Sequence, residues 1–222
     1  MNTRRNLLFG AGVAAAGLAA LSAGLAGRNW AAPEPEYAEG DSFGARYFPN
    51  LTLYTHQGKR VKLYDDLMRD KVVTFNMMYT MCGGLCPTMT ANLRGAQRLL
   101  GERAGKNIFM YSITLQPELD TPEVLREYAE SHHVGPGWLF LTGEPADLEK
   151  LRRKLGFFDP DPVIDADRAT HIRMVRIGND RYDQWTMASA RSHPEQLVAA
   201  INMVDRSVDY TAYNGRDAGL PA

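Results

Sequence analysis

The sequence predicts an α/β domain in which helices cover both faces of a mixed sheet. Three observations lead to this fold class. Apolar runs of strand length alternate with segments of helical periodicity, hairpin patterns stand at both ends of the domain, and the chain's two cysteines, Cys82 and Cys86, mark the start of the first long helical segment. Residues 43–209 are enough for one domain with one core.

The first elements are a hairpin, a strand and a helix. Leu51–Thr55 and Val61–Leu63 are short strand-like runs on either side of the turn signal Gln57-Gly58-Lys59. Val72–Met78 has the character of a buried strand, and a helix is expected from Cys86 onward. The apolar residues that recur along this helix are Met89, Leu93, Ala96 and Leu100.

Two further strand and helix units follow, and a hairpin and a helix complete the domain. Buried strands are predicted at Asn107–Ile113 and Trp138–Leu141, and helices should start at Thr121 and after the second strand. Ile172–Ile177 and Tyr182–Met187 are predicted to form the late hairpin around a turn at Gly178–Arg181, before a last helix opened by Ser192 and Pro194. With a dithiol at the start of the first long helix, this order of elements is thioredoxin-like.

The cysteine pair is the strongest functional signal in the chain. The segment from Cys82 to Cys86 has three intervening residues, and Pro87 is suited to the first turn of a helix. A helix amino terminus favours the thiolate form of Cys86, which makes the pair a reactive dithiol or a metal site. A structural disulfide is the alternative for an exported protein, but so short a loop would stabilise the fold little.

The amino terminus predicts export. Arg4 and Arg5 resemble a twin-arginine signal, and no charged residue follows them until Arg28. Residues 1–27 are expected to be a signal, cleaved after Ala26, or a membrane anchor that leaves the rest of the chain on the extracytoplasmic, periplasmic side. Residues 28–42 are expected to form a flexible linker and residues 210–222 a loose tail.

Composition argues against nucleic acid as a partner. The formal net charge is −1 at pH 7, and the basic residues are scattered rather than gathered in a stripe with aromatic side chains. The acidic segment Asp159–Asp167 lacks the glycine and the final glutamate of a calcium loop, and its predicted state is a solvated turn. Met77, Met78 and Met89 are expected to pack in the core, whereas Met81 is left open as a soft copper ligand.

From about Phe48 to Val204 the chain resembles the Sco family, also called SenC, of membrane-tethered copper proteins. The resemblance rests on Thr80-x-Cys82-x-x-x-Cys86-Pro87, on Asp120-Thr121-Pro122-Glu123-Val124-Leu125 and on His171 before the late hairpin. It implies that Cys82, Cys86 and His171 bind copper and that the protein is a metallochaperone for a respiratory oxidase. It also implies a copper-accepting enzyme subunit and a thiol reductant as partners.

The residue chemistry agrees with copper as the ion. Thiolates select Cu(I), imidazole accommodates both Cu(I) and Cu(II), and structural zinc would require four protein ligands. From the sequence alone, however, a histidine at a strand start such as His171 is more often an ordinary half-buried residue. Thr170 and Ile172 stand where many family members have aspartate and serine, which could weaken the orientation of the imidazole.

Three function classes are compatible with the pattern. A copper chaperone, which is not an enzyme, uses the dithiol together with His171. A thiol-disulfide oxidoreductase needs only Cys82 and Cys86, one as the attacking thiolate and the other to resolve the mixed disulfide. A thiol peroxidase would have a proline and a threonine ahead of one attacking cysteine at another spacing, which residues 78–82 do not supply.

Overall fold

The structure is a computed structural model that describes residues 42–81, 86–167 and 173–207. The strands are β1 (Thr52–Thr55), β2 (Arg60–Lys62), β3 (Val72–Met78), β4 (Ile108–Thr114), β5 (Trp138–Gly143), β6 (Met174–Asn179) and β7 (Gln184–Ser189). The helices are α2 (Phe43–Tyr47), α3 (Cys86–Leu100), α4 (Pro122–Ser131), α5 (Pro145–Lys154), α6 (Pro162–Ala166) and α7 (Pro194–Val204). The short helical turns are η1 (Leu63–Met68), η2 (Gly101–Arg103) and η4 (Asp180–Tyr182).

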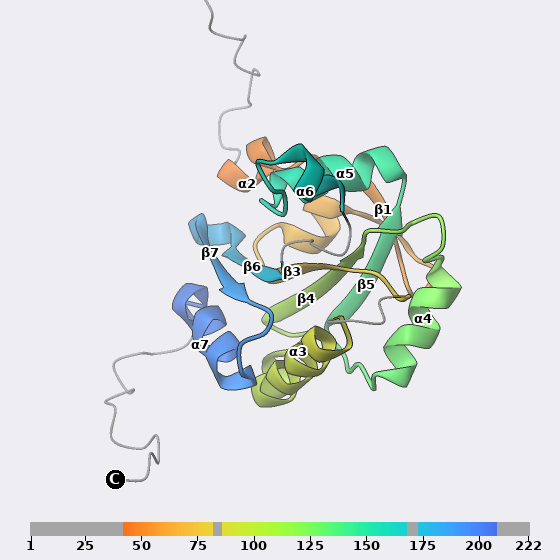
Figure 1. The fold of residues 1–222 in the computed structure, drawn as a ribbon. Coiled ribbons are helices and arrows are strands. Elements are labelled where there is room, and N and C mark those ends of the chain that lie inside the picture. The colour runs from red at the N-terminus through yellow and green to blue at the C-terminus, as the bar shows by residue number, and fades with distance from the viewer. Residues whose placement is uncertain (1–41, 82–85, 168–172, 208–222) are drawn as a thin grey trace, which may run out of the picture. The chain divides into compact units, whose positions relative to one another are not determined.

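The strands form one mixed sheet in the order β2-β1-β5-β4-β3-β6-β7 (Figure 1). β3, β4 and β5 run parallel in its centre, and the outer pairs are antiparallel. Parallel neighbours need a crossover connection, which α3 supplies between β3 and β4, and α4 between β4 and β5. The predicted mixed sheet and both predicted hairpins are therefore confirmed.

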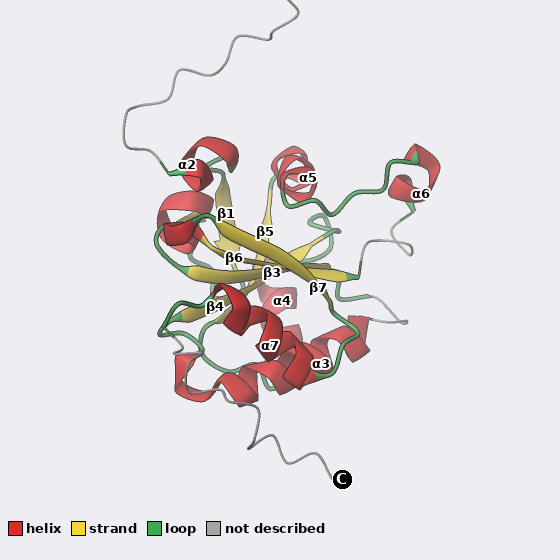
Figure 2. Ribbon diagram, turned by 90° about the vertical axis from the view of Figure 1, so that its left-hand side faces the viewer, coloured by secondary structure: helices red, strands yellow, loops and turns green. Residues whose placement is uncertain are grey.

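Helices cover both faces of the sheet, as Figure 2 shows with α3, α4 and α7 on one side and α2 and α5 on the other. Alternate residues of a strand point to opposite faces, and β4 follows this rule. Met110 packs with the cluster that contains α3 and α7, whereas Tyr111 and Ile113 pack with the cluster of η1 and α5. The predicted apolar face of α3 is buried at Met89, Leu93, Ala96 and Leu100.

The late hairpin lies about two residues further along the chain than predicted. Gly178 was expected in the turn, but it belongs to β6 and pairs with Trp185 of β7. A Cβ atom on Gly178 would lie 2.1 Å from the indole ring of Trp185, so packing of that ring requires the glycine. The turn is made by η4, and Asp183 takes the left-handed conformation with φ of 49°.

Helix starts agree with the predicted capping chemistry at one site and differ at another. Thr121 caps α4, because its hydroxyl accepts a hydrogen bond from Val124 N–H at 3.4 Å. The cap of α7 is His193 rather than the predicted Ser192, and the His193 N–H donates to Gln196 Oε1 at 3.3 Å. Side chains three residues into a helix often close the first turn in this way.

The predicted signal or anchor (residues 1–27) lies outside the described residues, as do almost all of the linker (28–42) and the tail (210–222). Within the described ranges, no helix has both the length and the apolar character needed to cross a membrane.

Candidate metal centre

The predicted cysteine unit follows the carboxyl end of the central strand β3. The strand ends at Met78 and α3 begins at Cys86, the residue at which a helix was predicted. Cys82 lies outside the described residues. The first N–H groups of a helix have no partner within the helix, and they stabilise negative charge near them. The helix α3 therefore begins at the residue for which the sequence predicts a thiolate.

The strand that follows the predicted histidine starts at the same edge of the sheet. β3 and β6 are antiparallel, with Phe75 opposite Arg176. The carboxyl end of β3, which leads to Cys82, consequently lies beside the amino end of β6, which follows His171 in the chain. His171 itself lies outside the described residues, together with Thr170 and Ile172. Strand pairing thus brings the two chain segments that flank the predicted ligands to one edge.

A buried carboxylate anchors the chain on the way to Cys82. Asp120 is fully buried, and one of its oxygens accepts a hydrogen bond from the Thr80 hydroxyl at 2.5 Å. The other oxygen accepts from the Thr80 N–H at 3.3 Å and from the Thr114 hydroxyl. Thr114 ends β4 and pairs with Met78 at the end of β3. Asp120 therefore joins the ends of two parallel strands to the loop before α4.

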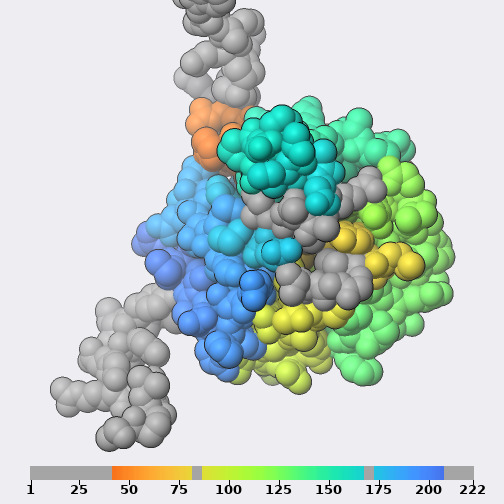
Figure 3. Space-filling model, in the orientation of Figure 1, coloured from red at the N-terminus to blue at the C-terminus, as the bar shows by residue number. Residues whose placement is uncertain are grey.

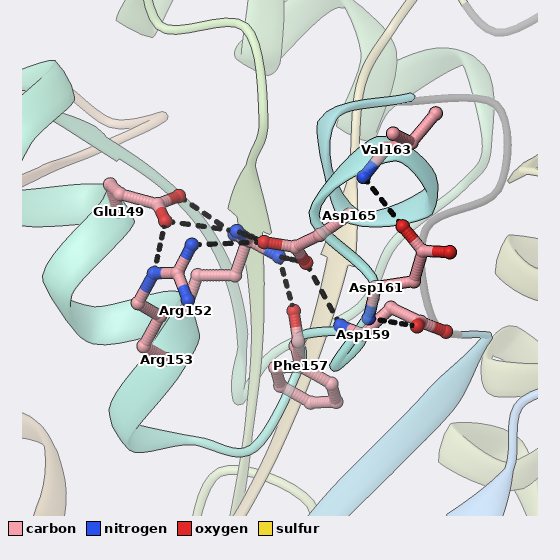
Figure 4. A network of polar contacts seen from close by, with 8 residues as sticks. All are labelled: Glu149, Arg152, Arg153, Phe157, Asp159, Asp161, Val163 and Asp165. Carbon is pink, nitrogen blue, oxygen red and sulfur yellow. Dashed lines mark hydrogen bonds and ion pairs between the residues drawn. The ribbon is translucent and has the colours of Figure 1, made fainter.

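An arginine clamp holds α6 against α5 (Figure 4). Arg152 binds the two oxygens of Asp165 with its two terminal nitrogens, at 2.6 and 2.7 Å, and Arg153 donates to Asp165 at 2.9 Å. Both arginines also bind Glu149, and the Asp159 N–H donates to Asp165 Oδ1 at 2.9 Å. These bonds with Arg152 hold the pKa of the Asp165 carboxyl well below its usual range.

The acidic segment 159–167 is therefore more ordered than the predicted solvated turn. Pro162–Ala166 form the short helix α6, and Asp161 caps it by accepting a hydrogen bond from Val163 N–H at 2.9 Å. The Asp165 side chain is only 8% exposed, while Asp161 and Asp167 are exposed. The partner that orders Asp165 is Arg152, and charge composition alone does not reveal that pairing.

α6 borders an open groove at the cysteine edge of the sheet. The groove has a volume of about 380 Å³ and is lined by the ends of β3 and β4, by the loop after β4, and by α5 and α6. In Figure 3 the teal surface of α6 and the yellow surface of the β3–α3 region share one face of the molecule. Met81, which was left open as a copper ligand, is 77% exposed beside Cys82 in the chain.

Two of the described histidines, His56 and His132, have structural contacts, and the predicted core methionines are buried. His56 Nδ1 accepts a hydrogen bond from Phe140 N–H at 3.1 Å, and burial lowers the pKa of His56. His132 stacks on Tyr128 with ring centroids 4.0 Å apart. Met77, Met78 and Met89 are each 1% exposed, which confirms the predicted core packing. Among the described residues, no group of three or more histidine, cysteine, aspartate or glutamate side chains is arranged to hold a metal ion.

Comparison with known proteins identifies relatives over most of the domain. The family model described as SCO1/SenC matches residues 39–204. The SCO1 protein homolog of Bacillus subtilis is 29% identical over 106 residues, which are 47% of this chain and 53% of that protein. The match thus spans about half the length of this curated relative.

Solved structures show the same fold. The copper-bound ScoI of Bradyrhizobium japonicum has a TM-score of 0.56 at 23% identity, and covers 69% of this chain and 96% of that one. A second similar structure is BsSco, which has a TM-score of 0.56 at 20% identity. It was solved in a study of a disulfide switch and is described as a member of the Sco family of cytochrome c oxidase assembly proteins. The similarity to BsSco covers 69% of this chain and 90% of that one. These structures confirm the predicted thioredoxin-like fold.

Proposed function

The chain belongs to the SCO1/SenC family, and from this membership we propose that it is an extracytoplasmic copper metallochaperone. It binds copper through Cys82, Cys86 and His171, and it delivers the ion to, or prepares, a respiratory copper enzyme such as cytochrome c oxidase. The observation that carries this proposal is the antiparallel pairing of β3 with β6. Because of that pairing, β6 begins at the edge of the sheet where β3 ends. His171 comes shortly before β6 in the chain, and Cys82 comes shortly after β3.

The chemistry of the three ligands suits an ion that is held and then passed on. Two thiolates select Cu(I), and an imidazole also accommodates Cu(II). Three protein ligands leave the coordination shell incomplete, so a ligand from the recipient protein can attack the copper ion before the chaperone releases it. Oxidation of Cys82 and Cys86 to a disulfide would remove both sulfur ligands, so copper binding requires a thiol reductant as a second partner.

The proposed location follows from the amino-terminal sequence. Arg4 and Arg5 would remain on the cytoplasmic side, while the uncharged segment up to Arg28 crosses the membrane or is removed after export. If the segment is retained, the linker 28–42 would let the domain reach a membrane-bound oxidase subunit. A related solved protein, a SCO1/SenC family lipoprotein from Bacillus anthracis, is consistent with membrane attachment outside the cytoplasm.

Replacing His171 by alanine should weaken copper binding by more than about 100-fold, because one of three ligands is lost and even groups that only orient a ligand cost about 10–100-fold. The reduced domain, residues 43–222, would be titrated with Cu(I) and Cu(II) in competition with a chromophoric chelator. His132→Ala is the matched control, since His132 caps the far end of α4 and stacks on Tyr128. Equal affinities of the His171→Ala protein and the parent would refute the ligand role of His171.

A second candidate function is thiol-disulfide exchange without metal, which the disulfide switch named for BsSco favours. One thiolate of the Cys82–Cys86 pair would attack a partner disulfide and release one partner thiolate. The second thiolate of the pair would then attack the mixed disulfide and release the other partner thiolate, leaving the partner reduced and the pair oxidised. This function needs both cysteines but not His171, so the titration above separates the two candidates.

A further inference from the structure

Asp120 is a fully buried acidic residue in the loop before α4. Its side chain is fully buried, and its oxygens accept three hydrogen bonds, two from Thr80 and one from Thr114. No lysine or arginine forms an ion pair with it in the part of the chain that the structure describes. Burial of a carboxylate costs free energy unless hydrogen-bond donors compensate for the lost water. The three donors therefore stabilise Asp120 in its buried position, and Asp120 in turn fixes the positions of Thr80 and Thr114.

The loop that carries Asp120 is itself fixed. Asp120 N–H donates to the Gln116 carbonyl at 2.8 Å, and Gln116 N–H donates to the Thr114 hydroxyl at 2.8 Å. Thr121 next to it caps α4, and Thr114 lies in the sheet at the end of β4. The carboxylate is therefore attached to the sheet and to a helix, so that it offers Thr80 a fixed anchor.

Thr80 connects this arrangement to the cysteine pair. It lies two residues beyond the end of β3 and two residues before Cys82. Its backbone N–H and its hydroxyl are both bound by the same carboxylate, so the position and the orientation of the chain are set at this point. At the other end of the loop between the two cysteines, the backbone of Cys86 belongs to α3. This helix packs into the core through Met89 and Leu93.

We propose that Asp120 is a positioning residue that acts through Thr80 to present Cys82 to Cys86. The inference deepens the proposed function and rests on it, because it takes Cys82 and Cys86 as the working thiol pair. When both ends of a short loop are fixed, the two sulfur atoms have a high effective concentration with respect to each other. Loss of the Thr80 anchor lowers this effective concentration, both for closing a disulfide and for sharing one copper ion.

The test is the equilibrium of the thiol pair with glutathione, in which one glutathione disulfide is reduced to two glutathione molecules as Cys82 and Cys86 form their disulfide. The equilibrium constant should fall by about fivefold in Thr80→Val and in Asp120→Asn, since preorganisation is lost. Thr80→Ser keeps the hydroxyl that donates to Asp120, so its equilibrium constant should stay within about twofold of the parent value. Thr80→Val keeps the test valid if Asp120→Asn does not fold.

Thr121→Ala is the matched control, because it removes the cap of α4 and destabilises the fold next to Asp120 without removing a bond to Thr80. An unchanged constant in Thr80→Val, or an equal fall in Thr121→Ala, would overturn the positioning role. The readout contains no copper. If the parent binds no copper while the constant still falls in Thr80→Val, the copper proposal fails and the positioning role stands.

Discussion

Replacing Cys86 by serine should abolish tight Cu(I) binding. Changes to residues that only orient a metal ligand typically cost 10–100-fold in affinity, so loss of a ligand itself should cost more, on the order of a thousandfold. The physical reason is that a serine hydroxyl is a hard, protonated donor, whereas a cysteine thiolate is soft and is a form that a helix amino terminus favours. Competition with a chromophoric Cu(I) chelator measures the loss.

This substitution should leave the fold intact, which separates ligation from stability. Serine is a favourable residue at the start of a helix, and α3 is held by buried side chains further along, such as Met89 and Leu93. Thr88→Ala, at an exposed position in the first turn of the same helix, is the matched control and should bind Cu(I) like the parent. If Cys86→Ser retained Cu(I) affinity within tenfold of Thr88→Ala, Cys86 would not be a ligand.

Replacing Asp165 by asparagine should destabilise the domain by about 2 kcal/mol, between the small value of an exposed ion pair and the larger cost of breaking a buried one. Asparagine has an NH₂ group in place of one of the two carboxylate oxygens that Arg152 binds. The guanidinium of Arg152, which is only 12% exposed, therefore loses one of its two acceptors at residue 165. Thermal unfolding at pH 7 should show a midpoint lower by roughly 4–8 °C. Arg153→Gln, at a 54% exposed side chain, should cost less than about 1 kcal/mol.

The same clamp predicts a dependence of stability on pH. Arg152 lowers the pKa of Asp165 in the folded protein below the value of about 3.9 expected in the unfolded chain. A carboxyl of this kind contributes stability that is fully present above the unfolded pKa and is lost as the pH falls toward the folded pKa. The difference in unfolding free energy between the parent and Asp165→Asn should hold from pH 7 to about pH 5 and shrink below about pH 4. A difference that stays constant down to pH 2 would contradict the clamp.

Local sequence patterns predicted most of the elements that make up the sheet. The run Val72–Met78 became β3, which is buried along its whole length, because a central strand is apolar on both faces. The helical spacing after Cys86 and the cap at Thr121 both correspond to observed helix starts. These features depend on residues close together in the chain, and such residues can be read from a single sequence.

The features that were missed depend on residues far apart in the chain. Asp120 and Thr80 were each recognised as parts of family motifs, but the bond between them joins positions that β3 and β4 bring together. The helix α6 was missed because the clamp of Asp165 by Arg152 provides order that an acidic segment lacks by itself. Gly178 was placed in a turn because glycine favours turns, whereas here it makes room for Trp185.

The candidate metal centre is predicted more from the sequence than from contacts in the structure. Cys82 and His171 lie outside the described residues, so their ligand roles stay predictions. The structure contributes the start of α3 at Cys86 and the common edge of β3 and β6. The common edge is a condition that a shared copper ion requires, since His171 is far from the two cysteines in the chain.

X-ray absorption at the copper edge tests the central claim most directly. The protein loaded with one equivalent of copper should show two sulfur neighbours and an imidazole nitrogen around the ion. The imidazole signal should disappear in His171→Ala and persist in His132→Ala, and the sulfur signal should decrease in Cys86→Ser. A copper shell of oxygen and nitrogen alone, or an imidazole signal that survives in His171→Ala, would contradict the proposed site.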